Sequence, residues 1–488
     1  MEVLVAVAAW AIGTFCSTLS HSNGFASTIC PRGNISVDLA SKLSSGAHIY
    51  YPGSSGFAEA TDRWSALDAP NVTIIVEVAT ENDVAETVKY ANASNIPFIA
   101  VNGGHGAITS LGKVHHGIEI WLNQLNSVTI SPTGDTATFG GGILTKTIHR
   151  HAVGSRQADR GGHGFLQGRH GLIADQFVSM RLVLADGSIM TVDSSSDLFW
   201  AIKGTGHNFG IVTEVTSKIY DVEDGGLWSY SSFVFTYDKV EGLYDRINTH
   251  LLQNSTQPVD VLHYSFFFNS PTIDPDHAVI AFFILREGVS AVEETYTAPF
   301  HELGPVASDA AAGTYQDLAA WTSNANESPP CQKAGLVNIR FPVNMQRYNV
   351  TTQRLAFDTF STIAHQTPAL NNSLFLFEGY AVQGVQAIPA ESTAFPHRED
   401  NLIVAPLIIY APAGPALDAE AIAFGRGLRQ IIFTGSGETE LHAYVNYAFG
   451  DERPQDWYGY EPWRIERLTA LKEKYDPERR FNFFAPFA

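Results

Sequence analysis

The sequence is poor in cysteine and in basic residues. It contains 3 cysteines among 488 residues, and 50 acidic against 30 basic side chains give a net charge of −20. No cluster of Lys and Arg offsets this balance, so binding to nucleic acid or anionic lipid is disfavoured and a small-molecule partner is favoured. Charged residues are only 16% of the chain and hydrophobic residues 45%. Such a chain is long enough for two or three domains with large cores.

Several motifs with known chemistry are also missing. No Walker loop of the form GxxxxGK[ST] occurs, which disfavours a kinase or ATPase. The segment "GTGHNFG" at 204–210 follows a helical pattern and precedes a strand pattern, whereas the dinucleotide fingerprint requires a strand, a loop and then a helix. The histidines of one region have no HExxH or CxxC spacing, so we predict no metal site there; they are His115, His116, His149, His151, His163 and His170.

The N-terminus has no hydrophobic run long enough to span a bilayer. The apolar stretch from Val3 to Phe15 is followed by small polar residues, which predicts a signal peptide over 1–26, cut after Ala26, with a buried N-terminal segment as the alternative. We therefore expect passage through the secretory pathway and no membrane anchor after cleavage. Cys30 and Cys331 would then remain, and sequence alone does not show whether they pair. Candidate glycosylation sites are Asn34, Asn71, Asn92, Asn254, Asn326, Asn349 and Asn371.

Patterns along the rest of the chain change twice. Residues 68–222 mix short strands and helices, including the strand "NVTIIVEV", a helix after Thr80 with Val84, Val88 and Ala91 on one face, and the strand "IPFIAV". Residues 223–440 carry longer aromatic strands between helices, which predicts a sheet covered by helices on one face, with its other face over a site. Residues 441–488 are dense in Tyr and Trp, which suits either the lining of a pocket for a flat ligand or the seam between domains.

Three separated glycine loops are the strongest local signal for a ligand. They are "NGGHG" at 102–106, "GGHGFLQG" at 161–168 and "GTGHNFGIV" at 204–212. Glycine allows successive backbone N–H groups to point into one concavity, and such a nest binds a pyrophosphate without a helix dipole. With "GIEIWLNQLNSV", "SDLFWAIKGTGHNFGIVTEV", "YVNYAFGDE" and "KYDPERRFNFF" in this order, the chain resembles the berberine-bridge-enzyme-like FAD-linked oxidases of the vanillyl-alcohol-oxidase superfamily, and most closely their fungal secondary-metabolite members.

The resemblance implies an α+β fold in which residues 27–67 and 68–222 form a PCMH-type FAD-binding domain, 223–440 a substrate domain, and 441–488 a segment that returns to the flavin. It implies bound FAD, covalently attached through His105. The implied cofactor-binding residues are Asn102, Gly103, Gly104, His105, Gly106, Gly161, Gly162, Gly164, Gly206, Phe209, Gly210, Ile211 and Val212. In "YVNY", Tyr444, Asn446 and Tyr447 are the implied catalytic residues, and one of the two tyrosines would be the base.

The chain departs from the family pattern in two places. Many members carry a glutamate base before the "FPHR" motif, where this chain has Gln383, Gln386 and Ala387, and neither Glu378 nor Glu391 matches the position. The family's Gly-rich segment with a second flavin-attaching cysteine is missing, since only Ala158, Asp159 and Arg160 separate Gln157 from Gly161, and no cysteine lies between Cys30 and Cys331. We therefore expect attachment through His105 alone and a shortened cradle.

These observations predict an FAD-dependent oxidase that transfers a hydride from a small metabolite to flavin N5, with O2 as the electron acceptor. Two alternatives stay open. In one, the shortened loop impairs flavin binding and the protein is a non-redox cyclase or metabolite-binding protein. In the other, the fold serves as a secreted binding module.

Overall fold

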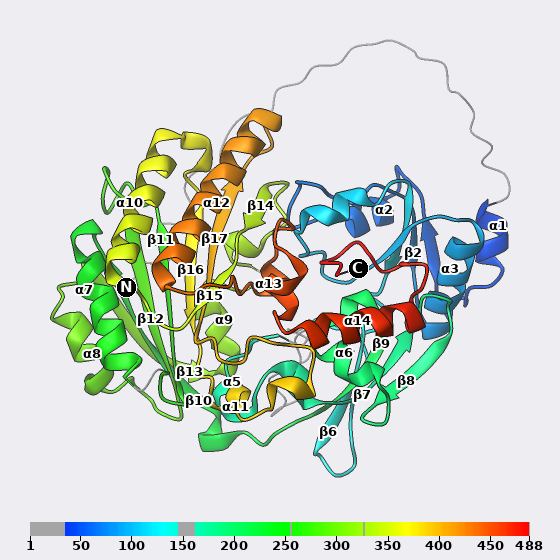
Figure 1. The fold of residues 1–488 in the computed structure, drawn as a ribbon, viewed down its shortest axis with the longest axis horizontal. Coiled ribbons are helices and arrows are strands. Elements are labelled where there is room, and N and C mark those ends of the chain that lie inside the picture. The colour runs from blue at the N-terminus through cyan, green and yellow to red at the C-terminus, as the bar shows by residue number, and fades with distance from the viewer. Residues whose placement is uncertain (1–34, 145–161, 254–255, 326, 488) are drawn as a thin grey trace.

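The computed structural model describes residues 35–144, 162–253, 256–325 and 327–487. Within these ranges the strands form three sheets of four, five and eight strands. Figure 1 shows the two smaller sheets on the right and the large sheet on the left, with the C-terminal helix α14 (Pro462–Tyr475) lying over the smaller sheets' side. The predicted signal peptide and the shortened loop lie outside the described residues.

The first sheet has the order β1-β2-β4-β3. Its strands are β1 (His48–Tyr50), β2 (Val72–Glu77), β3 (Phe98–Val101) and β4 (Gly117–Trp121), and β2, β4 and β3 run parallel. Helix α3 (Glu81–Ala93) links β2 to β3 and begins with a capping box between Thr80 and Asp83. Val84, Val88 and Ala91 are buried against the sheet, as predicted. This unit places the loop 102–106 at the carboxyl end of a parallel strand.

The second sheet has the order β5-β6-β9-β7-β8, and all neighbouring strands are antiparallel. Its strands are β5 (Val128–Ile130), β6 (Thr136–Gly140), β7 (Phe177–Val183), β8 (Ile189–Asp193) and β9 (Ile211–Lys218). A run of glycines at the end of β6 packs on both small sheets: a Cβ on Gly141 would lie 2.0 Å from the Val212 carbonyl oxygen, and one on Gly142 would lie 1.6 Å from the Leu122 oxygen. A side chain at either position would force these backbones apart.

The third sheet has the order β13-β10-β12-β11-β16-β17-β14, with β15 paired to β17, and its neighbouring strands are antiparallel. Its strands are β10 (Leu227–Phe235), β11 (Val261–Phe268), β12 (Val279–Glu287), β13 (Ala307–Thr314), β14 (Val337–Arg340), β15 (Val343–Met345), β16 (Leu374–Gly379) and β17 (Leu402–Tyr410). Helices α7 (Val240–Arg246), α8 (Glu294–His301), α10 (Val350–Gln366) and α12 (Pro415–Ser436) lie along one face (Figure 1).

The two faces of this sheet follow the alternation of side chains along its strands. On β12, Ile280 and Phe282 belong to the core beneath the helices, whereas Phe283 and Leu285 belong to a second cluster on the opposite face. That second cluster includes Tyr264, Tyr380 and Tyr444, and partly buried Phe165 and Tyr447 pack against it. The prediction of a sheet covered by helices on one face is confirmed, and the structure adds that its other face carries aromatic side chains.

The remaining helices are short apart from α14. They are α1 (Ile35–Ala40), α2 (Ser55–Thr61), α5 (Gln167–His170), α6 (Leu198–Thr205), α9 (Leu318–Trp321), α11 (Gln383–Gln386) and α13 (Pro454–Tyr458). Leu468 and Leu471 of α14 join Leu198 and Ala201 of α6 in one buried core, so the C-terminal segment packs on the domain that contains the glycine loops. Among the described residues, every helix is too short or too polar to cross a membrane.

Candidate active site

The loop after β3 has the backbone conformation that its glycines predict. Gly104 has a φ of +68°, and a Cβ there would lie 3.1 Å from the Asp62 carbonyl oxygen and 3.2 Å from Lys333 Nζ. Asn102 donates a hydrogen bond from Nδ2 to the Ile143 carbonyl oxygen over 2.9 Å, which ties the loop to the glycine run after β6. His105 at the end of the loop is exposed. The loop therefore presents backbone and one reachable imidazole at the carboxyl end of β3.

The second predicted loop lies directly against the predicted catalytic residues. A Cβ on Gly162 would lie 1.9 Å from the Tyr444 hydroxyl, so only glycine allows this approach. Gly164 donates its N–H to Gln167 Oε1 over 3.3 Å. The structure thus brings Gly162 together with Tyr444, while Gly161 lies outside the described residues.

The third predicted loop packs inward. Phe209 and Ile211 are buried in the cores of the domain that contains the glycine loops. Gly210 lies against β7, since a Cβ there would meet the Val183 oxygen at 2.9 Å. A Cβ on Gly206 would meet no atom closer than Ile202 Cγ2 at 3.6 Å, so this position has room for a side chain. Val212 packs on the same core as Phe209. These residues hold β9 in place, and any contact with a ligand would come from their backbone.

The three predicted catalytic residues meet in one turn, Val445–Tyr447 with Tyr444 preceding it. Asn446 donates a hydrogen bond from Nδ2 to the Tyr444 hydroxyl over 2.7 Å. The rings of Tyr444 and Tyr447 are 5.1 Å apart and nearly perpendicular. This turn lies at the aromatic face of the large sheet, which is the face that the sequence predicted to lie over a site.

A buried carboxylate completes this cluster, although the sequence analysis found none that matched. Tyr447 donates its hydroxyl to Glu378 Oε1 over 2.8 Å, and Tyr380 donates to Oε2 over 2.7 Å. Glu378 lies on β16, five residues before Gln383, which instead begins α11 and donates to the Gln257 carbonyl oxygen. Glu378 did not match the family's base position in the sequence, yet the structure brings its carboxylate to Tyr447, because it comes from strand β16 and not from the segment after it.

Electrostatics keep the protons of this cluster on the phenols. Burial raises the pKa of the Glu378 carboxyl, and the hydrogen bonds from Tyr380 and Tyr447 and the charge of Arg340 oppose that shift. Burial and the Glu378 charge raise the pKa of the Tyr447 phenol well above its usual value. The Arg340 guanidinium lies 4.3 Å from the Tyr447 ring centroid and 4.4 Å from that of Trp64. Tyr447 is therefore a protonated phenol that points at a carboxylate acceptor.

His163 is half-buried beside the same turn. Its ring lies 4.8 Å from that of Tyr444, and burial lowers its pKa to about 4, so the imidazole is neutral at neutral pH. Its Nδ1 donates to Gln167 Oε1 over 2.8 Å, and its buried Nε2 has no hydrogen-bond partner among the residues that the structure describes. An unpaired buried acceptor is costly, and a polar ligand group would satisfy it. His170, by contrast, stacks on Tyr220 at 3.8 Å.

These observations fit a bound FAD. The glycine loops supply close-packed backbone, His105 is exposed at its loop, and the His163 nitrogen without a partner among the described residues lies beside the aromatic cluster, which suits a flat polar ring. The sequence reasoning missed Glu378, Arg340 and the glycine run 140–142. The run "GGG" was a visible signal, whereas a single Glu or Arg on a strand carries none before its partners are known.

The candidate glycosylation sites differ in accessibility. Asn71, Asn349 and Asn371 are exposed, although Asn349 also caps α10 and donates to the Gly435 oxygen. Asn92 is half-buried and donates from Nδ2, the atom that would carry a glycan, to the Ala185 oxygen over 2.7 Å. Asn34, Asn254 and Asn326 lie outside the described residues, as does Cys30. Cys331 is half-buried and forms no disulfide with another residue that the structure describes.

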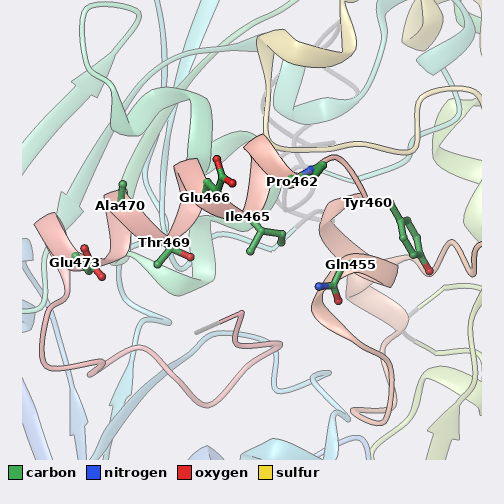
Figure 2. Close-up of a pocket in the computed structure, with 8 residues that line it drawn as sticks. All are labelled: Gln455, Tyr460, Pro462, Ile465, Glu466, Thr469, Ala470 and Glu473. Carbon is green, nitrogen blue, oxygen red and sulfur yellow. The ribbon is translucent and has the colours of Figure 1, made fainter.

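A separate surface pocket of about 570 Å³ lies along α13 and α14. Figure 2 shows that Ile465, Glu466 and Thr469 line it from successive turns of α14. None of the aromatic cluster residues lines this pocket, so it is not the site assembled around Tyr444.

Comparison with known proteins shows the family to which the chain belongs. Residues 72–193 match the FAD binding domain family and 443–485 match the family described as berberine and berberine like. The FAD-linked oxidoreductase chyH of Penicillium rubens is 46% identical over the full length of both chains. The FAD-linked oxidoreductase chry5 of Gibberella zeae is 46% identical, covering 92% of this chain and 94% of its own. The chyH alignment spans 503 positions, more than the 488 residues here, so that relative has residues without a counterpart in this chain.

Solved structures share the fold at low identity. Xylooligosaccharide oxidase from Myceliophthora thermophila C1 has a TM-score of 0.77 at 17% identity, covering 93% of this chain and 100% of its own. The 6-hydroxy-D-nicotine oxidase of Arthrobacter nicotinovorans has a TM-score of 0.73 at 20% identity, covering 92% and 99%. These structures share the fold, and the 46% identical relatives that match along nearly the whole chain show that the protein belongs to the berberine-bridge-enzyme-like FAD-linked oxidoreductases and is an FAD-dependent oxidoreductase.

Proposed function

We propose that the protein is an oxidase that removes a hydride and a proton from a small, flat secondary metabolite. The observation that carries this proposal is the buried chain of hydrogen bonds from Tyr447 and Tyr380 to Glu378, next to the glycine loop at Gly162. When bound, FAD would supply the oxidant by accepting the hydride at N5 and passing the electrons to O2. The protein's own residues would bind the metabolite and take its proton.

Glu378 is the final proton acceptor in this proposal. Because the pKa of Tyr447 is raised, its phenolate is scarce at neutral pH, and a proton taken up by the Tyr447 oxygen has to be passed on at once. The Glu378 carboxylate lies 2.8 Å from that oxygen, within the range for direct proton transfer. The raised pKa of Glu378 brings it closer to the working pH, which favours its role as the acceptor. Tyr444 would orient the substrate, with Asn446 holding its hydroxyl.

The substrate class is supported by the aromatic face of the large sheet. On this face the ring of Phe165 packs between two tyrosines. Its centroid lies 6.2 Å from that of Tyr264 and 5.7 Å from that of Tyr315. Such rings favour a planar, largely apolar molecule with few polar groups. We therefore expect a cyclic or phenolic metabolite.

We further propose that FAD is attached through His105 alone. The imidazole is exposed at the end of its loop, and its Nε2 lies 3.4 Å from the Cys331 carbonyl oxygen, so the ring is oriented but reachable. The neutral imidazole is a nucleophile at ordinary pH. No cysteine between Cys30 and Cys331 is available for a second bond.

The test uses purified full-length protein. It should be yellow, and its flavin absorbance should stay with the protein after acid precipitation. His105→Ala should release or lose the flavin, whereas His115→Ala, an exposed histidine of the same domain, should keep it. Dithionite-reduced protein should reoxidise rapidly in air if O2 is the acceptor. A folded but colourless unmodified protein would refute the oxidase and favour the cyclase or binding-protein alternative.

We also propose that the protein enters the secretory pathway, which the N-terminal apolar run and the exposed sequons support. A secreted mature chain beginning at Ser27 and glycans at Asn71 or Asn371 would support it. Protein that keeps its N-terminus and lacks glycans when expressed in a fungal host would contradict it.

A further inference from the structure

His397, Asp400 and His442 form a compact cluster outside the flavin site. One ligand-type atom from each lies within 4.8 Å of the others. His442 Nδ1 lies 3.1 and 3.2 Å from the two oxygens of Asp400, and the two imidazole rings are stacked at 4.2 Å. The first two residues come from the loop before β17, and His442 comes from the segment after α12. The fold thus brings together three side chains that bind transition metals.

Hydrogen bonds from neighbouring groups hold His397 and Asp400 in place, as they do around known metal ligands. His397 donates from Nε2 to the Asp456 carbonyl oxygen over 2.9 Å, which leaves Nδ1 with its lone pair toward the cluster. Asp400 accepts from Asn344 Nδ2 over 3.0 Å and from Gln346 Nε2 over 3.4 Å. A ligating histidine commonly donates its other N–H to a backbone carbonyl, and a ligating carboxylate is commonly held by hydrogen bonds.

The charge of the cluster calls for a cation. Asp400 is 7% exposed, and its two oxygens accept hydrogen bonds from Asn344 and Gln346, as a carboxylate does. Among the described residues its ion-pair partner is His442, and no Lys or Arg pairs with it. When both imidazoles are neutral, a buried negative charge remains, which is costly without a counterion. The carboxylates of Glu438, Glu440 and Glu461 add negative potential around the two histidines.

We propose that His397 Nδ1, the Asp400 carboxylate and His442 bind one divalent transition-metal cation, with Zn²⁺ as the best match and a water as the fourth ligand. Two imidazoles and one carboxylate are a common donor set for zinc. Zinc bonds of about 2.0 to 2.1 Å put tetrahedral ligands roughly 3.4 Å apart, so the contact of His442 with Asp400 has to open slightly, and the stacked imidazoles have to turn until both aim a nitrogen at the ion. His442 can move, because its side chain is 31% exposed, and this side also gives the ion its entry path.

A bound metal ion would stabilise the turn that carries Tyr444, Asn446 and Tyr447. The His442 carbonyl oxygen accepts the Asn344 N–H over 2.8 Å, and Tyr444 follows two residues later. A metal bond from His442 to the loop before β17 would therefore anchor the start of the segment that carries Tyr444, Asn446 and Tyr447. This role would be structural, since the three ligands do not belong to the Glu378 cluster.

The test measures metal content directly. Purified full-length protein is stripped with a chelator, incubated with Zn²⁺ and desalted, and zinc is then quantified against protein. We expect one zinc per chain, at least tenfold less in His442→Ala and Asp400→Asn, and an unchanged content in His365→Ala, which removes an exposed histidine of α10. Zinc should also raise the Tm of the unmodified protein and of His365→Ala, but not that of His442→Ala, because a ligand that binds only the folded state stabilises it.

His442 is half-exposed, so its alanine variant should fold even if Asp400→Asn does not, and circular dichroism would verify this. Zinc retained at one per chain by folded His442→Ala would overturn the proposal. Unmodified folded protein that loses all its zinc on desalting, with no zinc-dependent change in Tm, would overturn it as well.

Discussion

The Tyr447 hydroxyl donates a 2.8 Å hydrogen bond to Glu378 Oε1, although the two residues are 69 positions apart in the sequence. The carboxylate is buried and receives a second phenol, Tyr380, on its other oxygen. Replacing Glu378 by Gln keeps the shape and removes the proton acceptor. We expect flavin reduction by a metabolite that the unmodified protein oxidises to slow about 10²- to 10⁴-fold, the range for loss of a general base.

The flavin spectrum of Glu378→Gln should be retained, so the loss would lie in the reaction and not in cofactor binding. Stopped-flow absorbance measures the rate. Glu391→Gln is the matched control, because this glutamate is exposed and interacts with Trp200 through its backbone. Unchanged reduction in Glu378→Gln would remove the carboxylate from the mechanism.

Gly162 and Tyr444 should show strong coupling. A Cβ at Gly162 would lie 1.9 Å from the Tyr444 hydroxyl but 3.2 Å from the ring carbon that carries it. Gly162→Ala should therefore lower stability by about 1–3 kcal/mol, as other overpacked sites do, and should lower flavin content. Combining it with Tyr444→Phe removes the clashing oxygen and should restore most of both. Urea denaturation of the four proteins in this double-mutant cycle measures the coupling, and additive effects would show that the two groups do not touch.

The buried ion pair of Arg398 and Asp175 should be needed for the glycine loop. Both side chains are 2% exposed, and the nitrogens of Arg398 lie 2.8 and 3.0 Å from the Asp175 oxygens. Asp175 also accepts the Leu172 N–H in the segment that follows the loop. Arg398→Ala leaves a buried charge and should cost about 3–5 kcal/mol, with loss of flavin. Arg347→Ala, at an exposed arginine, should cost little, and equal effects in both variants would contradict this role.

Acid should destabilise the protein through its buried histidines. Burial lowers the pKa of His263 to about 3, from an ordinary value of 6.5. Above pH 6.5 the residue is neutral in both the folded and the unfolded chain. Below it only the unfolded chain takes up the proton, so the free energy of unfolding falls by up to about 1.4 kcal/mol per pH unit until about pH 3.

On acidification the free energy of unfolding should fall less in His263→Gln than in the unmodified protein, by about 2 kcal/mol between pH 6.5 and pH 5. Urea midpoints at pH 7 and pH 5 measure it. The control is His365→Gln, since His365 is exposed. An equal pH dependence in His263→Gln and the unmodified protein would show that this histidine does not titrate in unfolding.

Glycan attachment should discriminate between two described sequons. Asn371 is exposed, whereas the Asn92 amide nitrogen already donates to the Ala185 oxygen. In protein secreted by a fungal host we expect a glycan at Asn371 and none at Asn92, as measured by glycopeptide mass spectrometry. An Asn92 glycan on folded protein would contradict the packing of α3 against the segment after β7.

Much of the architecture follows from local patterns. The apolar face of α3 and the loop after β3 were predictable because periodicity and glycine conformation act within a few residues. Glu378 was not, because both faces of β16 are apolar on either side of it and nothing local says which face meets the site. The pairing of His442 with His397 and Asp400 depends on a crossing of distant segments, and it has no spacing signature.

The contact between Gly162 and Tyr444 also sets an order of events during synthesis. One side of the contact is translated well before the other, and the turn that carries Tyr444 lies among the last residues of the chain. Most of the chain is therefore translated before the two sides of this contact can meet. A chain truncated before Ala443 would have the described glycine loops but would lack the turn that packs against Gly162.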